Sequence, residues 1–284
     1  MIEIKNKHTG EILARIDADT LAGADLRDMR LTEANLRGMN LSRARLDNAD
    51  LFEADLRETD LSHAILWGAH LSQADLSNAN LRSARFSNGT HAGAAMLAHC
   101  TLWSADLSGA DLRQVDLHEA NLAHANLSRA DLRKAVMQGA NFSHALLRNA
   151  LLIDANLREA DLSHADLRDA HLNEANLIRA KLRGADLGSG DEHHFAVLNR
   201  ANLESADLTG VQMRQAILVE ANLRNANLTD ADLTHAIISG TILRNANVRN
   251  ANFEGVELAT VTMDFANFSE AKNADIPAYK THLR

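Results

Sequence analysis

Several residue types are scarce in this 284-residue chain, and each scarcity excludes a class of protein. Cysteine occurs once, as Cys100, so no intramolecular disulfide framework can form. Proline also occurs once, as Pro277, so no proline-rich linker divides the chain, and aromatic residues make up only 4% of it. No apolar run approaches the roughly 18 residues that a membrane-spanning helix needs. We therefore expect no membrane-bound form.

The beginning of the chain and its charge narrow the expectation further. The first eight residues are too polar for a secretory signal, and together with the lone thiol they favour a cytoplasmic protein. Lys and Arg number 29 against 38 Asp and Glu, which gives a net charge of −9 and disfavours direct binding of nucleic acid. No glycine-rich phosphate loop, nucleophile elbow or zinc-type spacing is present. The sequence therefore predicts neither an enzyme nor a cofactor.

A five-residue repeat is the dominant feature of the sequence. The phrase Ala-(Asp/Asn)-Leu recurs in one frame, for example at Ala24-Asp25-Leu26, Ala34-Asn35-Leu36, Ala54-Asp55-Leu56 and Ala74-Asp75-Leu76. We call the large apolar residue of each unit its centre. Five residues of α-helix advance about 500°, so successive centres would spiral around every side. In a straight strand they would point to opposite faces, because side chains alternate with period two. The pattern fits a chain that bends once per unit, with the centre and the alanine inside.

These phrases resemble the pentapeptide-repeat family, over about residues 21–268. The resemblance implies an all-β fold, a right-handed quadrilateral parallel β-helix in which four units make one coil. At 20 residues per coil the chain would form about 12 coils, and a spacing of roughly 4.8 Å gives a length of about 58 Å. Alanine is expected because the narrow interior has no room for a second large side chain.

The organisation predicted from the pattern has three parts. Residues 1–20 are expected to form an N-terminal β-hairpin cap, because alternating apolar residues flank a turn at Gly10. Residues 21–271 are expected to form the β-helix, and residues 272–284 a short C-terminal cap or tail. The centres occupy three frames, Leu21–Met96, Leu102–Leu187 and Leu198–Phe268, in which His91 is the one centre that is not apolar. The frame therefore slips near 97–101 and again near 188–197, each slip predicting a bulge or small loop.

Two columns of outward residues are candidate sites, because residues 20 apart should stack on one side of the coils. The first column holds His124, His144 and His164, a weak candidate for a zinc or nickel site; ordinary variation at a surface position is the alternative. The second holds Val197, Ile217 and Ile237 in place of the usual Asp or Asn, with Val219 beside Ile217. Leu146, Leu151 and Ile153 also replace polar residues, on what we expect to be adjoining sides. Exposed apolar ladders often mark contact surfaces, although scattered surface hydrophobes are common.

The sequence thus favours a non-enzymatic binding or scaffolding protein with an unknown protein partner, or with a second copy of itself. The family resemblance suggests an alternative, a mimic of duplex DNA that binds DNA gyrase or another type II topoisomerase. Duplex DNA about 58 Å long carries roughly 34 charges, far more than this chain's net −9. Arg113 and Arg133 also follow Asp111 and Asp131 and should share their face. Metal binding by the histidine column is a minor alternative.

Overall fold

The computed structural model describes residues 1–188 and 195–280. They fall into two compact units, Met1–Asn141 and Phe142–Arg284, and each unit is described by itself. None of the helices in the described part of the chain has the length and apolar character needed to cross a membrane. The histidine pair His193-His194, which the sequence places in the second frame slip, lies outside the described residues.

The first unit begins with an antiparallel hairpin. Strands β1 (Ile2–Asn6) and β2 (Ile12–Ile16) pair with Ile2 opposite Ile16. The connecting turn uses Gly10 at a φ of 71°, a left-handed conformation that glycine adopts without strain. The other edge of β1 pairs with β3 (Ala34–Asn35), so the sheet order is β2-β1-β3. The hairpin is thereby joined by backbone hydrogen bonds to the first repeats.

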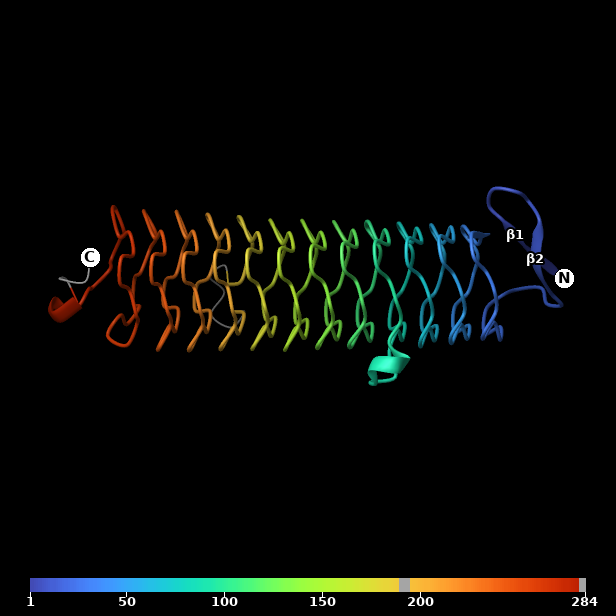
Figure 1. Ribbon diagram of the computed structural model, residues 1–284, viewed down its shortest axis with the longest axis horizontal. Helices are drawn as coiled ribbons and strands as arrows, with labels where there is room; N and C mark the ends of the chain where they lie inside the picture. Colours follow the sequence, from blue (N-terminus) through green and yellow to red (C-terminus); the bar gives the residue numbers. More distant parts are fainter. Residues whose placement is uncertain (189–194, 281–284) are drawn as a thin grey trace. The chain divides into compact units, whose positions relative to one another are not determined.

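In both units the repeats form a β-helical solenoid whose coils are 20 residues long (Figure 1). Parallel bridges join the outward residue before a centre to the one 20 positions later, as in Asp25–Arg45 and Arg45–Ile65, or 26 positions later where the coil contains an insertion, as in His70–Met96 and His171–Val197. At the Asp25–Arg45 bridge, for example, the N–H of Leu26 donates to the carbonyl of Arg45 at 2.8 Å, and the N–H of Arg45 donates to the carbonyl of Ala24 at 2.9 Å. Every coil therefore satisfies the backbone groups of the next.

The bend in each five-residue repeat explains why Asp or Asn usually stands before the centre. The N–H of Ala24 donates to the carbonyl of Leu21 at 3.0 Å and closes a turn. The third of the four residues in such a turn is left-handed, as in Asp28 at a φ of 58°. The side chain before each centre supports the next turn: Asp60 Oδ1 accepts from the N–H of Ser62 at 3.0 Å. Short acceptors such as Asp and Asn reach their own backbone two residues on, and leucine cannot.

The interior is filled by two kinds of side chain. The leucine centres are buried, as in Leu46 and Leu157, each 0% exposed, and the alanines beside them are equally buried, as in Ala44 and Ala165. Since the interior of each coil is closed in this way, only the outward residues and the loops are available for contacts.

The first frame slip lies elsewhere than the sequence suggested. Leu97 is fully buried, whereas Met96 is 45% exposed, so Leu97 is the centre and Met96 is an outward residue. The N–H of Ala95 donates to the carbonyl of Phe86 at 2.8 Å, which closes the insertion at residues 87–94. The prediction of His91 and Met96 as centres, with a slip at 97–101, is wrong. Periodicity could not separate two adjacent apolar residues, and the burial of Ala95 decides between them.

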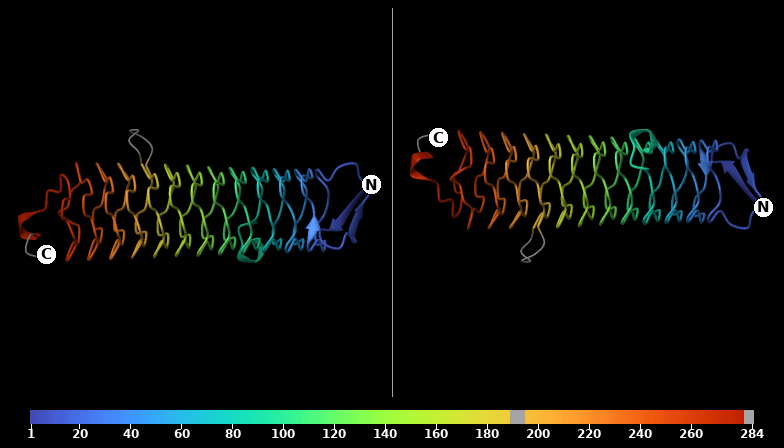
Figure 2. Two further views of the ribbon diagram at one scale, coloured as in Figure 1. Left: turned by 90° about the horizontal axis from the view of Figure 1, so that it is seen from above. Right: turned by 90° about the horizontal axis from the view of Figure 1, so that it is seen from below.

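The insertion contains the short 3-10 helix η1 (His91–Gly93), and it projects from the side of its unit (Figure 2). Thr90 caps η1, because its side chain accepts from the N–H of Gly93. The second insertion closes in the same way, with the N–H of Ala196 donating to the carbonyl of Leu187 at 2.7 Å. Residues 189–194 of that insertion are outside the described range.

The described residues of the second unit end in the 3-10 helix η2 (Ala278–Lys280). Lys280 Nζ donates to the carbonyls of Leu258 and Val261 at 2.9 and 2.6 Å, and the hydroxyl of Tyr279 donates to the carbonyl of Ala259 at 3.0 Å. Burial lowers the pKa of Lys280. These side chains thus reach backbone acceptors of the preceding coil.

We predict that Ala165→Leu destabilises the protein by about 1–3 kcal/mol, because the packed interior has no space for three more carbons. Arg183→Leu is the control, because Arg183 is exposed and this substitution places the same leucine on the outside. Urea unfolding followed by circular dichroism measures both free energies. Equal effects of the two substitutions would show that the alanine column is not tightly packed.

Candidate functional site

An outward apolar column runs along one side of the second unit. Val197 pairs with Ile217, and Ile217 pairs with Ile237, by parallel bridges. Ile237 is 49% exposed, and the other two side chains are partly exposed. The stacking of these three residues on one side is as the sequence predicted.

Two further residues lie on this same side rather than on adjoining sides. Leu151 pairs with His171, and His171 pairs with Val197, so Leu151 belongs to the same column. Ile153 follows the buried centre Leu152, just as Val219 follows Leu218. The sequence placed Leu151 and Ile153 on adjoining sides, and that placement is wrong for a simple reason: the second insertion shifts the numbering by six residues, which hides the shared column.

We name this surface the apolar ladder and define it by six residues, Leu151, Ile153, Val197, Ile217, Val219 and Ile237. Leu146, 44% exposed, lies in another column, where it pairs with Asp166. Polar residues interrupt the ladder, because His171 stands between Leu151 and Val197, and Asn173 and Asn199 stand between Ile153 and Val219.

An open hollow of about 390 Å³ adjoins the ladder, lined by Asn173, Glu174, Asn199, Arg200, Val219 and Glu220. Arg200 Nε contacts a carboxylate oxygen of Glu220 at 2.8 Å, and its Nη1 lies 3.9 Å from Glu174. The hydrogen bond to Glu220 raises the pKa of Arg200. Two carboxylates thus share one guanidinium, which leaves the three side chains with a net negative charge.

The floor of the hollow is made by asparagines that bind backbone. Asn173 Oδ1 accepts from the N–H of Asn199 at 3.1 Å, and Asn199 Oδ1 accepts from the N–H of Val219 at 3.0 Å. These bonds fix the side chains in place. Because Val219 belongs to the ladder and also lines the hollow, the apolar and acidic surfaces are continuous.

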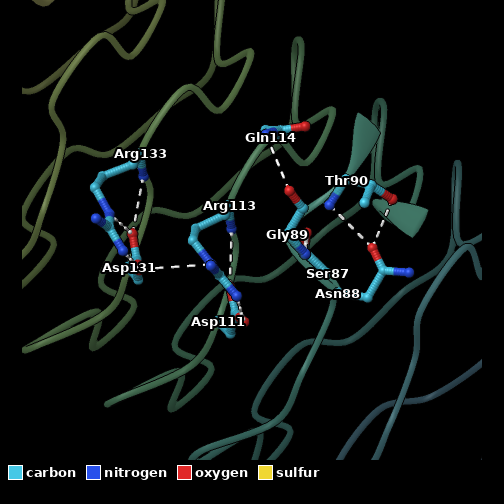
Figure 3. Close-up of polar contacts among 9 residues, drawn as sticks. All are labelled: Ser87, Asn88, Gly89, Thr90, Asp111, Arg113, Gln114, Asp131 and Arg133. Carbon is cyan, nitrogen blue, oxygen red and sulfur yellow. Dashed lines mark hydrogen bonds and ion pairs between the residues drawn. The ribbon is translucent and has the colours of Figure 1, made fainter. Parts of the chain in front are cut away.

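The outward charges of the first unit are arranged in alternating pairs (Figure 3). Arg113 Nη2 lies 2.7 Å from Asp111, and its Nε lies 3.7 Å from Asp131, which Arg133 also contacts at 2.6 Å. The hydrogen bond to Asp111 raises the pKa of Arg113. A run of carboxylates is therefore interrupted by guanidinium groups, and the expectation that these residues share one face agrees with the contacts.

The insertion at residues 87–94 lies beside these pairs. Asn88 Oδ1 accepts from the N–H of Thr90 at 3.0 Å, and the carbonyl of Gly89 accepts from Gln114 Nε2 at 3.4 Å (Figure 3). A hollow of about 340 Å³ on this unit is lined in part by His91, His118 and Val136. Sequence reasoning missed this hollow because its residues come from different columns and from the insertion.

The histidine column is divided between the two units. In the second unit the rings of His144 and His164 are stacked, with centroids 5.1 Å apart and an angle of 13° between the planes. Gly184 follows in the column, and a Cβ there would lie 2.8 Å from the His164 ring. His124 belongs to the first unit, where its ring lies edge-on to Trp103 at 6.2 Å. Across the described ranges no group of three or more His, Cys, Asp or Glu has the arrangement that could hold a metal ion.

The model for pentapeptide repeats matches the chain in eight copies, and the chain belongs to the pentapeptide-repeat family. The copies cover residues 21–57, 54–90, 95–133, 116–153, 150–188, 194–225, 206–245 and 243–272. The family named from the repeated phrases is therefore confirmed. No curated protein sequence matches the chain.

Several solved structures are similar to the chain. HetL, a pentapeptide repeat protein involved in heterocyst differentiation regulation in the cyanobacterium Nostoc sp. strain PCC 7120, is 33% identical; the match covers 75% of this chain and 86% of HetL, with a TM-score of 0.32. A thylakoid-lumen protein of Arabidopsis thaliana is 32% identical over 38% of this chain and 70% of its own, with a TM-score of 0.35. QnrB1, a plasmid-mediated fluoroquinolone resistance protein, is 17% identical over 83% and 86%, with a TM-score of 0.33.

Cys100 occupies an alanine position of the repeat and is buried. Burial raises the pKa of its thiol, so in the folded chain the thiol stays neutral where an exposed thiol would ionise. The unfolded thiol ionises near its ordinary pKa of about 8.5. Stability is therefore expected to fall as pH rises above about 8.5, by about 1.4 kcal/mol per pH unit.

Comparing wild type with Cys100→Ala by urea unfolding between pH 7 and pH 10 measures this effect. The alanine variant lacks the thiol and should be the more resistant of the two to alkaline pH. Parallel stability curves for the two proteins would contradict the burial of the thiol.

Proposed function

We propose that this protein is a non-enzymatic, protein-binding β-helix whose outward columns and insertions carry its contacts. The observation that carries the proposal is the closed interior, in which leucine and alanine leave no room for a substrate. The two hollows described above, of about 390 and 340 Å³, lie on the outside and are open. A regular array of outward side chains suits the recognition of another macromolecule.

The proposal includes the finer features of the fold. We expect a right-handed helix of about 12 coils, at 20 residues per coil, acting in the cytoplasm, with the β1–β2 hairpin as its N-terminal cap. The pairing of β1 with β3 supports the cap, as does the hydrogen bond from the N–H of Lys7 to the carbonyl of Glu33 at 2.8 Å. An uncovered sheet edge invites pairing with other chains, and the hairpin occupies part of that edge.

The apolar ladder is the surface that we expect a partner to cover. Asp or Asn usually stands before each centre, so apolar side chains there contribute nothing to the turns and leave apolar surface exposed to water. A protein partner, or a second copy of the chain, would remove that surface from water. Burial of apolar area is the dominant favourable term in association.

Mimicry of DNA at a type II topoisomerase is the alternative function. The net charge of −9 supports it. The pairing of Asp111 and Asp131 with Arg113 argues against it, because a mimic needs a continuous line of negative charge. We therefore favour a protein-binding role without a topoisomerase.

A gyrase supercoiling assay separates the two functions. We predict that the protein, added in excess over gyrase, neither inhibits supercoiling nor protects the enzyme from a fluoroquinolone. Inhibition or protection at stoichiometric amounts would support the DNA mimic and contradict the favoured role.

For the favoured role we predict that Ile217→Asp leaves the fold intact and weakens the complex with the partner or with a second copy. Aspartate is the usual residue at this position of the repeat, so the fold should tolerate it. Ile242→Asp is a matched control, because Ile242 is also an outward, partly exposed residue before a centre, in another column.

Light scattering on purified protein and stoichiometric co-purification from the native source measure the effect. Loss of the complex with Ile217→Asp and its retention with Ile242→Asp are expected. A chain that stays monomeric and captures no stoichiometric partner would contradict the proposed function itself.

A further inference from the structure

We propose that the apolar ladder and the adjoining hollow bind one amphipathic α-helix of a partner protein. The apolar stripe of the helix would lie along the ladder, and a Lys or Arg beside that stripe would contact the carboxylate of Glu174 or Glu220 at the hollow. The inference rests on the proposed protein-binding function and specifies the kind of partner.

The width of the ladder fits a single helix. Ile217 lies just before the centre Leu218 and Val219 just after it, at the start of the turn that the N–H of Ala221 closes on Leu218, so the ladder is only two outward side chains wide. A helix with its side chains is about 10–12 Å wide. Four bridge steps lead from Leu151 to Ile237, about 19 Å along the column, which about 13 residues of helix would span.

The same dimensions disfavour a second copy of the chain as the occupant. A strip of about 10 by 20 Å presents roughly 200 Å², whereas a stable complex between two proteins buries about 800 Å² on each partner. A dimer would need much more of the surrounding surface, which at the hollow is charged and carries Glu174, Arg200 and Glu220.

The spacing of the rungs distinguishes a helix from an extended segment. Successive rungs are about 4.8 Å apart, so Val197 and Ile237 are separated by about 9.6 Å. Apolar residues of a helix at alternating three- and four-residue intervals are about 5.2 Å apart on average, which gives about 10.5 Å over two steps. In an extended chain, side chains on one face are about 6.6 Å apart, and two steps span about 13 Å. The apolar side chains of a helix therefore stay aligned with successive rungs of the ladder, whereas those of an extended segment do not.

The hollow adds charge complementarity. Arg200 contacts both Glu174 and Glu220, which leaves one negative charge without a matching cation among these three side chains. A lysine or arginine at the edge of the apolar stripe would supply that cation. Since Val219 lies on both surfaces, the cation and the stripe can belong to the same face of one helix.

A synthetic helical peptide tests the proposal on the full-length protein. The probe is an 18-residue fluorescein-labelled peptide with leucines at i, i+3, i+4 and i+7 and one lysine beside them. Two further peptides of the same composition serve as controls, one with its leucines spread over all sides and one with leucines at alternate positions. Fluorescence anisotropy measures each dissociation constant.

The expected result is that wild type and Ile242→Asp bind the helical peptide equally, and Ile217→Asp binds at least ten times more weakly. Glu174→Gln combined with Glu220→Gln should weaken binding at least threefold. That loss should vanish when the lysine of the peptide is replaced by glutamine.

Equal binding of the helical peptide to wild type and Ile217→Asp would overturn the proposal, as would tighter binding of the alternating peptide. A wild-type dimer that dissociates on Ile217→Asp, with no binding of the peptide, would assign the ladder to a second copy instead. If a co-purified partner is lost with Ile217→Asp but is not displaced by the helical peptide, the protein-binding function stands and the helix is wrong.

Discussion

The turn that recurs every five residues is the constraint on which the whole structure depends. A typical turn has a hydrogen bond from the N–H of the residue three after the centre, usually alanine, to the centre's carbonyl, as from Ala64 to Leu61 at 3.0 Å, and a left-handed residue such as His63. Left-handed geometry is uncommon outside glycine, and here it recurs along the chain at Asp, Asn, Glu, Gln, Arg, Ser and His. The stacking of coils compensates for this local strain, because the N–H of each left-handed residue reaches the next coil, as from His63 to Arg82 at 2.9 Å.

The same constraint determines where function can reside. Turns at this spacing bring leucine and alanine together inside each unit and leave about three outward positions in each repeat of five. Ion pairs such as Arg27–Asp25 occupy many of these positions, and the hydrogen bond from Arg27 lowers the pKa of Asp25. Such exposed pairs contribute little stability. The apolar ladder differs from them because its side chains satisfy neither a turn nor a charge.

Much of the fold could be predicted from the sequence, because the five-residue period admits few backbones. Leucine and alanine at fixed positions identify the interior. The 20-residue interval alone places Val197, Ile217 and Ile237 in one column. The frame from Leu102 onward was read correctly, but the place of the slip was not, because Met96 and Leu97 are both apolar and differ in burial. The shared side of Leu151 and Val197 was missed for a related reason, since an insertion changes the interval between neighbouring rungs. The hollow beside Val219 depends on the directions of Arg200 and Glu174, which no period encodes.

Cross-linking between neighbouring rungs tests the central claim, that residues 20 apart stack on one side of the coils. Cysteines at Ile217 and Ile237, in a Cys100→Ala background, should lie about 4.8 Å apart and form a disulfide on mild oxidation, because disulfides require Cα atoms roughly 4.4–6.8 Å apart. Cysteines at Ile217 and Ile242 stand in different columns and should stay reduced. Mass spectrometry of the oxidised proteins shows whether each pair of cysteines has formed a disulfide. A disulfide in the second pair, or none in the first, would contradict the 20-residue coil.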